Sequence, residues 1–386
     1  MNDSVVARGP CVLHVARVGF IGGAERIALT ILAGLHKKNW EPVLACPDGN
    51  FPEEARRRSV RYVPCSWNRM RGTYNPLRLL GYIAEVWRAH RQIETILVGG
   101  TVDLVHAHHP VMVLYACSSC RRHKVPLLLH LHEGPPGRIF DLIALKVAAR
   151  FADRIVCASS AGLDLLRNAG GDPAKAQVVK NAVDYDFTRA EVVPCEDARG
   201  PGPHIGIFGV LEPRKGQNYL IDAVPLLIDV YPDAKFWIVG GPQFEDKVSY
   251  AQHLVSLAQA RGVSEHLRFV GHQHNVERWM KAMDLVVLPS VSNESLSVVV
   301  LEALYLGISV VATDVGGIRD ALKDGETGFI VEPRSAVALA RAMTTALTEN
   351  GGAMTRRARE DAWERFAPDR LVVDMIAVYR RMIADR

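Results

Sequence analysis

Short apolar runs alternate with longer amphipathic segments along the whole chain. In the first half, apolar runs that fit buried strands occupy residues 11–16, 43–46, 104–107, 127–132 and 155–158. Segments with the spacing of amphipathic helices lie between or after them, at residues 25–35, 77–98, 139–151 and 161–168. Strands that alternate with helices form parallel sheets, so this pattern predicts an α/β domain.

A second alternating series begins at Ile205, with strands expected at residues 205–208, 236–239, 268–270, 285–288, 310–312 and 329–331. Between the two series, residues 192–203 lose periodicity and gather Pro and Gly, as a linker does. With 386 residues the chain is too long for one ordinary core. We predict a first domain over residues 1–190 and a second over residues 203–366.

Glycine-containing turns follow several strands of the second series. The first begins at Gly209 and contains two adjacent cations, Arg214 and Lys215, and another includes Gly316 and Gly317. Carboxyl ends of parallel strands share one edge of a sheet, which is where α/β proteins bind ligands. Two fixed cations beside a glycine turn suit a diphosphate.

Two glutamates eight residues apart follow the strand at 285–288. A serine-containing turn separates Glu294 from a helix expected over residues 299–306. The amides of Ser297, Val298 and Val299 would face a phosphate at the positive end of that helix. Glu302, about two turns into the helix, is placed to accept hydrogen bonds from a ribose diol. By itself, the spacing favours two solvated glutamates beside a helix start, and the neighbouring motifs are what favour the nucleotide site.

Taken together and in this order, the motifs of the chain resemble those of the retaining glycosyltransferases of family 4, the group that includes sucrose synthases and bacterial mannosyltransferases. The residues that carry the resemblance are Gly22-Gly23-Ala24-Glu25-Arg26, Val105-His106-Ala107-His108, His132-Glu133, Asn181-Ala182-Val183-Asp184, Arg214-Lys215-Gly216, Val239-Gly240-Gly241-Pro242, Leu288-Pro289-Ser290, Glu294 with Glu302, and Gly316-Gly317-Ile318. The resemblance implies the GT-B fold, in which two Rossmann-like domains face each other across a cleft. It also implies that a last helix, residues 367–386, packs back on the first domain.

Several positions depart from the family pattern and leave sugar preference and phosphate geometry open. Val210 stands where an Arg usually follows the first glycine, so Arg214 is expected to supply that charge. The other departures are Leu296 for an aromatic, Ser297 for Gly or Pro, Asp320 for Glu, and Glu133 for Asp.

The resemblance implies transfer of a sugar from a nucleotide-diphosphate donor, most commonly a UDP-sugar, with retention of the anomeric configuration. The implied catalytic residues are His132, Arg214, Lys215 and Glu294. The implied donor-binding residues are Gly22, Gly23, Gly209, Ser297, Val298, Val299 and Glu302. His132 ends a strand and would contact the transferred sugar; His130 points to the same face of that strand, and His106 and His108 end another strand.

Breaking a bond between sugar and diphosphate leaves negative charge on the phosphate, which cations and amides can stabilise. The expected site therefore needs no metal and no cofactor beyond the donor itself. An alternative is the triplet from Asp184 to Asp186, because metal-dependent glycosyltransferases of another fold hold a divalent cation with such a pair.

The net charge of +4 is unevenly distributed. Residues 1–186 carry 24 Lys and Arg against 16 Asp and Glu, whereas the remainder carries 22 against 26. A basic amphipathic segment with Trp and Tyr at residues 76–88, near Arg56, Arg57, Arg58, Arg61, Arg69, Arg71 and Arg91, suits an anionic membrane surface. The alternative is an ordinary domain helix, because Leu77, Leu80, Ile83, Ala84 and Trp87 also follow core spacing.

The composition indicates the cellular compartment. We find no apolar stretch of 18 residues and no signal peptide, and seven scattered cysteines argue for a reducing compartment. We therefore expect a cytoplasmic protein, with peripheral association at the inner membrane face as an option. Cys117 and Cys120, near His123, have zinc-site spacing but lack four grouped ligands.

Two other functions stay open: a nucleotide-sugar 2-epimerase of similar fold, which needs no acceptor, and a non-catalytic nucleotide-sugar-binding subunit. A NAD-dependent oxidoreductase is poorly supported, because residues 19–23 do not form GxGxxG. The expected partners are a donor and a hydroxyl-bearing acceptor, without nucleic acid.

Overall fold

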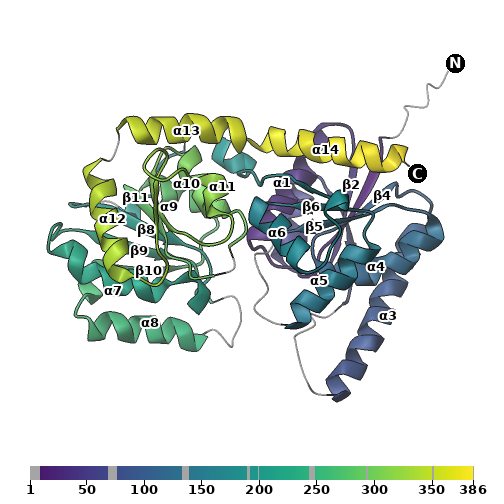
Figure 1. Ribbon diagram of the computed structural model, residues 1–386, viewed down its shortest axis with the longest axis horizontal. Helices are drawn as coiled ribbons and strands as arrows, with labels where there is room; N and C mark the ends of the chain where they lie inside the picture. The colour runs from purple at the N-terminus through teal and green to yellow at the C-terminus, as the bar shows by residue number, and fades with distance from the viewer. Residues whose placement is uncertain are drawn as a thin grey trace. The chain divides into compact units, whose positions relative to one another are not determined.

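The computed structural model describes residues 9–67, 76–132, 139–188, 192–198, 200–242, 248–292, 294–349 and 352–385. The chain forms two compact units, and Figure 1 shows the elements of each. Unit 1 consists of Met1–Asp184 and Pro368–Arg386, and unit 2 of Tyr185–Ala367.

Unit 1 is a parallel sheet with helices on both faces. Its strands are β1 (Cys11–Val15), β2 (Glu41–Cys46), β3 (Arg61–Pro64), β4 (Leu104–Ala107), β5 (Leu127–Leu131), β6 (Arg154–Cys157) and β7 (Ala176–Val178). Its helices are α1 (Gly23–Lys37), α2 (Asn50–Arg57), α3 (Pro76–Val98), α4 (Pro110–His123), α5 (Ile139–Phe151), α6 (Ser160–Asn168) and α14 (Pro368–Ala384). Every residue of β1, β4 and β5 is buried, as expected for strands covered on both faces.

Unit 2 has the same organisation. Its strands are β8 (His204–Phe208), β9 (Lys235–Val239), β10 (Leu267–Gly271), β11 (Leu285–Leu288), β12 (Ser309–Thr313) and β13 (Phe329–Val331). Its helices are α7 (Gln217–Ile228), α8 (Val248–Ala260), α9 (Val276–Lys281), α10 (Val298–Tyr305), α11 (Ile318–Ala321), α12 (Ala336–Thr348) and α13 (Ala353–Arg365).

The strand order of each sheet reverses once. Among the described residues, the sheet of unit 1 has the order β3-β2-β1-β4-β5-β6-β7, and that of unit 2 has the order β10-β9-β8-β11-β12-β13. All pairs of these strands are parallel. These are Rossmann-like orders, in which ligands bind at the carboxyl ends of the two strands where the order reverses. That point lies between β1 and β4 in unit 1, and between β8 and β11 in unit 2.

The last helix, α14, belongs to unit 1 although it follows unit 2 in the sequence. It packs beside α1, as Figure 1 shows. Its apolar stripe is buried, and the stripe includes Leu371, Val372, Met375, Ile376, Tyr379 and Met382. The stripe has the 3.6-residue period of an amphipathic helix, so the helix is stable only when that face is covered.

The segment that we expected to be a linker packs within unit 2. The chain divides between Asp184 and Tyr185, so the described parts of residues 192–203 follow the division. Cys195 N donates to Arg278 O at 2.9 Å, and Arg278 Nε donates to Val193 O at 3.2 Å. Among the described residues of this segment, the short 3₁₀ helix Glu196–Ala198 is the regular structure, and backbone groups beside it bond to the region of α9.

Within the described residues, no helix is both long enough and apolar enough to cross a membrane.

Candidate functional site

The loops after β8 and β11 meet in unit 2 and bring together three of the predicted catalytic residues. Lys215 ends the 3₁₀ turn Pro213–Lys215 after β8, and Glu294 lies in the loop between β11 and α10. Lys215 Nζ donates to Glu294 Oε1 at 2.5 Å, and Arg214 Nη1 lies 3.7 Å from the same oxygen. This ion pair therefore lies where the strand order of unit 2 reverses.

Glu294 is a buried carboxylate that is held in its charged form. Burial raises its pKa, but the charges of Lys215 and Arg214 outweigh burial and hold the pKa below the ordinary value of 4.5. Hydrogen bonds from Lys215 and from Ser290 Oγ, at 2.7 Å, act in the same direction. Arg214 Nε also pairs with Glu212 Oε1 at 2.6 Å, so the two cations face two carboxylates.

Two glycines, in the turns after β8 and β12, allow these turns to pack against the loop that carries Glu294. Gly216 has φ +70°, and a Cβ there would lie 1.9 Å from Pro289 O. Gly316, which follows β12, has φ +57°, and a Cβ there would lie 1.6 Å from Glu294 O. The adjacent Gly317 N donates to Glu294 O and Ser295 O at 3.2 and 2.8 Å. Only glycine fits both positions, so these turns fix the backbone that carries Glu294.

Helix α10 begins at Val298, one residue earlier than we expected. Ser297 is its N-cap residue and makes no side-chain capping bond, so the first amides of the helix remain available for an anion. Val298 and Val299 are partly exposed. Glu302 is the fifth residue of α10 and 2% exposed. It therefore lies about one turn into the helix, not two as we predicted.

Gly209 directly follows β8 and also has a glycine-type backbone. Its φ is +133°, and its N–H donates to Val239 O at 3.0 Å. A Cβ on Gly240 would lie 1.9 Å from Gly209 O, so the turns after β8 and β9 are in close contact. Gly209 thus allows the chain to turn from β8 toward the Arg214 and Lys215 loop.

The remaining predicted residues lie in unit 1. Gly22 is the N-cap of α1 and Gly23 its first residue, both after β1. Gly22 N donates to Glu25 Oε2 at 3.0 Å, so an anion at this amide would have to displace Glu25. Gly23 is exposed, and a Cβ there would meet nothing within 4 Å, so close packing does not require glycine at this position.

His132 follows β5 and is partly buried at the edge of a group of histidines. His132 Nε2 and His108 Nδ1 are 3.0 Å apart, and His108 Nε2 and His14 Nδ1 are 2.9 Å apart. The rings of His130 and His132 lie 3.8 Å apart, in agreement with the shared face predicted for them. Glu133 lies outside the described residues.

Asp184, which we considered as a metal ligand, already has protein partners. Its Oδ2 accepts hydrogen bonds from Arg58 Nη1 at 2.7 Å and Thr30 Oγ1 at 3.2 Å. The salt bridge to Arg58 joins the end of unit 1 to α2 and leaves this carboxylate, 6% exposed, with a structural role.

Sequence reasoning missed three contributors to these sites. Ser290 hydrogen-bonds Glu294, and Glu212 neutralises Arg214. His14 lies on β1 and joins the histidines of β4 and β5 only through the sheet. No local motif marks His14. Because successive side chains of a strand point to opposite faces of the sheet, the position of His14 in β1 fixes the face on which it lies.

Family models match both units. The model for glycosyl transferases group 1 matches residues 202–349, and the model for glycosyltransferase family 4 matches residues 21–187. The chain is 30% identical over 342 residues to the D-inositol 3-phosphate glycosyltransferase of Salinispora tropica, covering 80% of this chain and 69% of that protein. It is 30% identical over 332 residues to the enzyme of the same name from Mycobacterium sp. (strain JLS), covering 80% and 72%.

Solved structures agree on the fold. HepE from Anabaena in complex with UDP-glucose has a TM-score of 0.81 at 22% identity, covering 96% of this chain and 99% of that one. Sucrose-phosphate synthase from Thermosynechococcus elongatus has a TM-score of 0.81 at 18% identity, covering 98% and 100%. The two Rossmann-like units thus correspond to the GT-B fold, and the chain belongs to glycosyltransferase family 4.

Proposed function

We propose that this glycosyltransferase transfers a sugar from a nucleotide-diphosphate donor, a UDP-sugar by preference, with retention of the anomeric configuration. The observation that carries the proposal is the group of Arg214, Lys215 and Glu294 beside the start of α10, at the reversal point of a Rossmann-like sheet. Such a point binds nucleotides in other proteins. HepE, whose fold is similar, was crystallised with UDP-glucose.

In this mechanism the bond between the anomeric carbon and the diphosphate oxygen breaks. The acceptor oxygen bonds to the same face of that carbon, and its proton passes to the departing diphosphate. Negative charge grows on the leaving group, where Lys215, Arg214 and the first amides of α10 stabilise it. The carboxylate of Glu294 would repel a phosphate, so it is better suited to accept hydrogen bonds from sugar hydroxyls. Glu302 would bind the ribose, and His132 the transferred sugar.

Thermal-shift measurements with UDP, GDP, ADP and dTDP test the donor. A nucleotide present at 100 times its Kd stabilises the chain by about 2.7 kcal/mol, so the preferred base gives a clear rise in Tm. No shift with any of the four would contradict the nucleotide site. NMR of the product tests retention, because the anomeric coupling constant distinguishes the two configurations.

Product analysis without an acceptor separates the alternatives. A 2-epimerase would convert the donor alone into its epimer, whereas a glycosyltransferase would at most hydrolyse it slowly. A non-catalytic subunit would bind nucleotide without consuming the donor under any condition.

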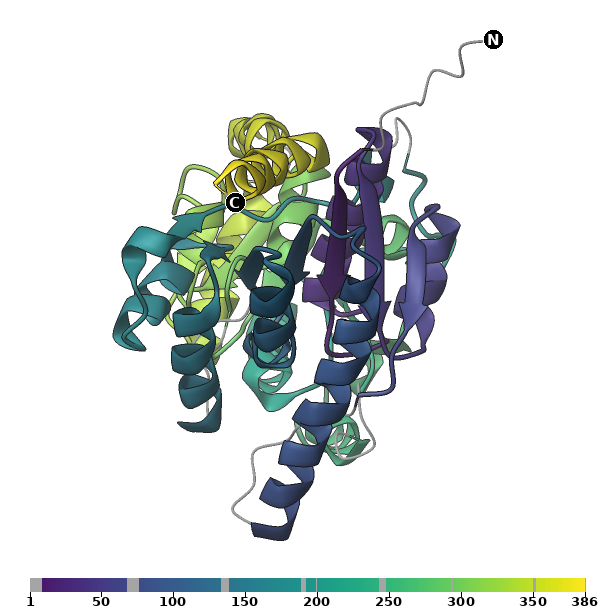
Figure 2. The ribbon, with the colours of Figure 1, turned by 90° about the vertical axis from the view of Figure 1, so that its right-hand side faces the viewer.

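We also propose that unit 1 binds an anionic acceptor at a membrane surface, through α3. Figure 2 shows α3 along the outside of unit 1, with its N-terminal end projecting from the unit. Ile83 and Trp87 are 67% and 56% exposed, one turn apart. Ile83 and Trp87 have the helical spacing expected of buried residues, but they are not buried. Helix α3 instead contacts the core through Ala89, Ile93 and Leu97. Exposed apolar side chains among arginines are typical of helices that bind anionic membranes.

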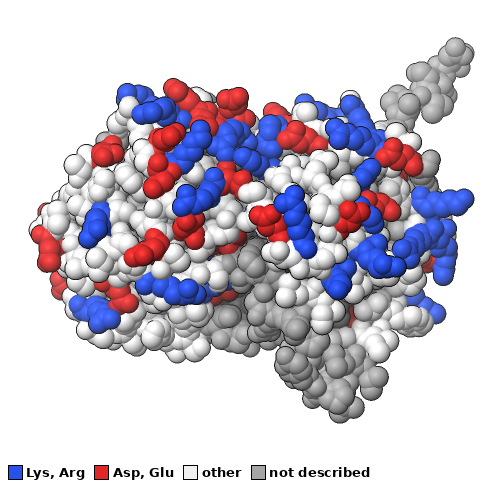
Figure 3. All heavy atoms as spheres, viewed as in Figure 1, with Lys and Arg blue, Asp and Glu red and all other residues white. Residues whose placement is uncertain are grey.

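The basic residues considered for this surface differ in whether a carboxylate of the protein already binds them. Arg58 is held by Asp184 and Glu54, so it does not contribute to this surface. Arg69 and Arg71 lie outside the described residues. In Figure 3, Lys and Arg side chains predominate along the outer edge of unit 1, whereas both signs are mixed over unit 2.

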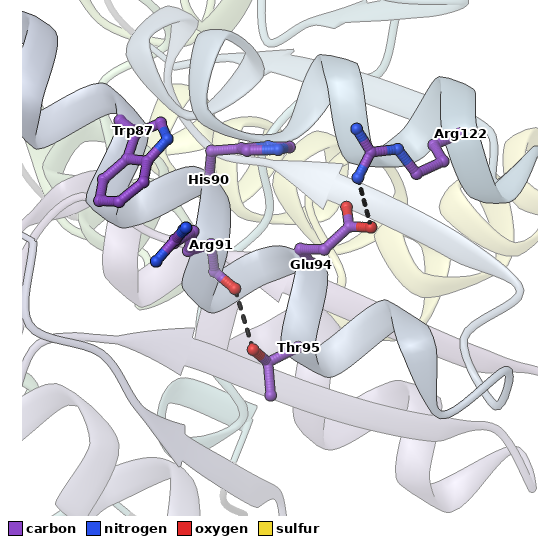
Figure 4. A pocket seen from close by; sticks show the side chains of 6 residues that line it. All are labelled: Trp87, His90, Arg91, Glu94, Thr95 and Arg122. Atoms are coloured by element: carbon purple, nitrogen blue, oxygen red, sulfur yellow. Dashed lines mark hydrogen bonds and ion pairs between the residues drawn. The ribbon is translucent and has the colours of Figure 1, made fainter.

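A hollow of about 450 Å³ between α3 and α4 contains Arg91, which we propose meets an anionic headgroup; Arg122 in the same hollow is already paired with Glu94. It is lined by Trp87, His90, Arg91, Glu94, Thr95 and Arg122, as Figure 4 shows. The Arg91 guanidinium lies 3.8 Å from the centre of the Trp87 ring, and Arg122 pairs with Glu94 at 3.1 Å. The hollow lies outside the nucleotide site, so it would hold part of the acceptor or a lipid phosphate.

Co-sedimentation with phosphatidylglycerol vesicles at low and high salt tests the membrane proposal. We expect binding that weakens with salt, because each engaged Arg contributes about 1 kcal/mol at an anionic surface. Trp87→Ser should reduce binding. Trp363→Ser is the matched control, since Trp363 is also exposed beside an arginine but lies on α13 of unit 2. Protein that stays in the supernatant at low salt would favour a small soluble acceptor.

A further inference from the structure

Histidines cluster on one face of the sheet in unit 1. His14 on β1 is paired in register with His106 on β4, and His108 follows two residues later. Alternate residues of a strand point to the same face, so the three imidazoles share a side of the sheet. The ring centres of His106 lie 4.7 Å from those of His14 and 4.1 Å from those of His108. His14 and His106 are fully buried, and His108 is 7% exposed.

Several nitrogens of this cluster lack a partner. Within the described part of the chain, buried His14 Nε2, His106 Nε2 and both ring nitrogens of His130 have no hydrogen-bond partner. Buried polar groups without partners are rare because their desolvation is uncompensated. Of these, His106 Nε2 belongs to the group of three imidazoles and points to a ligand that accepts an imidazole lone pair.

The donor atoms are close enough to surround one cation. One ring nitrogen from each of His14, His106 and His108 lies within 4.8 Å of the other two. Zn–N bonds of about 2.0–2.1 Å in a tetrahedral site require nitrogens about 3.4 Å apart. His14 Nδ1 and His108 Nε2 are 2.9 Å apart and hydrogen-bond each other, so a metal would replace this bond after a small adjustment. Burial lowers the pKa of all three imidazoles, so they are neutral near pH 7, the form that binds metals.

Two of these histidines also have outer partners of the kind that metal ligands use. His106 Nδ1 lies 2.7 Å from Tyr379 OH on α14, which leaves His106 Nε2 for a metal. His108 Nδ1 lies 3.0 Å from His132 Nε2. A ligating histidine usually donates its second N–H to such a partner, which fixes its tautomer and ring orientation.

We propose that His14, His106 and His108 bind one transition-metal ion of the Zn²⁺ type in unit 1. Imidazole favours Zn²⁺, Co²⁺, Ni²⁺ and Cu²⁺ over Mg²⁺ or Mn²⁺, which prefer oxygen ligands. The metal would stabilise unit 1 and, through the His108 Nδ1–H bond, orient His132. A second triad of histidines, His108, His130 and His132, would consume the residue proposed to contact the sugar.

Titration of the full chain with Co²⁺ tests this proposal, after chelation under mildly denaturing conditions, refolding and removal of any histidine tag. Tetrahedral Co²⁺ absorbs visible light, so we expect saturation at one ion per chain and loss of the bands on adding Zn²⁺. His106→Gln should abolish binding. His123→Gln, which changes a histidine outside the cluster, should bind as the unchanged chain does. Tyr379→Phe removes only an outer partner and should weaken binding roughly 10–100-fold.

Two results would overturn the proposal. One is a wild-type chain that shows no stoichiometric Co²⁺ bands, and the other is a folded His106→Gln variant that binds Co²⁺ as tightly as the wild-type chain does. Circular dichroism without metal establishes whether each variant folds. If His106→Gln does not fold, X-ray absorption of the metal-loaded unchanged chain decides. Three imidazole ligands support the site, whereas thiolate or all-oxygen ligation excludes it.

Discussion

Lys215 and Glu294 illustrate how one short contact can serve both stability and chemistry. Both side chains are largely buried, and each is the closest charged partner of the other. A buried pair contributes little net stability, but removing one member leaves an uncompensated charge. The two effects can be separated, because restoring neutrality recovers stability without restoring a cation at the diphosphate.

We predict that Lys215→Met lowers kcat about a hundredfold or more, since losing one donor to a developing charge costs roughly 3 kcal/mol. It should also destabilise unit 2 by about 3–5 kcal/mol. The double variant with Glu294→Gln should recover much of the stability and none of the activity. Urea unfolding and initial rates measure the two effects, and an unchanged kcat would refute the role of Lys215.

Glu302→Ala should act mainly on donor binding. A ribose contact is similar in the ground and transition states, so KM for the donor rises while kcat changes little. Nucleotide titration by calorimetry provides the check. Unaltered affinity would mean that Glu302 does not face the ribose.

Protonation of Glu294 gives a pH-dependent stability of defined sign. Its pKa in the folded chain lies below the ordinary value of 4.5, so its contribution is fully present above that value. The contribution is lost as pH falls through the lowered pKa, because the unfolded chain takes up the proton first. As pH falls below 4.5, the free energy of unfolding measured with denaturant should therefore decrease more steeply for the wild-type chain than for Glu294→Gln. Parallel curves would contradict this linkage.

At the scale of elements, the turn after β12 supports the loop before α10. Gly316 precedes α11 and lies against the backbone of Glu294. Its neighbour Gly317 hydrogen-bonds to that backbone. The site thus depends on two loops from adjacent strands, β11 and β12. A change in the loop after β12 should therefore displace Glu294 in the loop after β11.

We predict that Gly316→Ala lowers both stability and activity, because the new Cβ would lie 1.6 Å from Glu294 O. Gly325→Ala is the matched control. Gly325 has a similar positive φ of +71° but open space around its Cβ position, so it should show only the cost of the left-handed backbone. Equal effects of the two substitutions on kcat would show that the contact with Glu294 is unimportant.

At the scale of the whole molecule, the proposed donor site relies on protein cations and helix amides for charge stabilisation. We therefore expect sugar transfer to proceed without added Mg²⁺ or Mn²⁺. Activity that appears only after adding either ion would assign a divalent cation to the diphosphate. Asp184 would then have to leave Arg58 and Thr30, its present partners.

Local pattern was sufficient to predict much of this protein. Apolar runs and glycine turns predicted strands, helices and two α/β domains, because periodicity reports which residues are buried. The same reasoning placed Lys215 and Glu294 in loops at the carboxyl edge of a parallel sheet. These features depend on neighbours in the sequence, so the sequence alone determines them.

Other features depend on residues far apart in the chain, and only the tertiary structure decided them. Lys215 and Glu294 are 79 residues apart, and their contact exists only because β8 and β11 are adjacent. His14 joins His108 from 94 residues away through the pairing of β1 with β4. The exposure of Ile83 and Trp87 followed the same rule, because helical spacing identifies a stripe, whereas packing decides whether anything covers it.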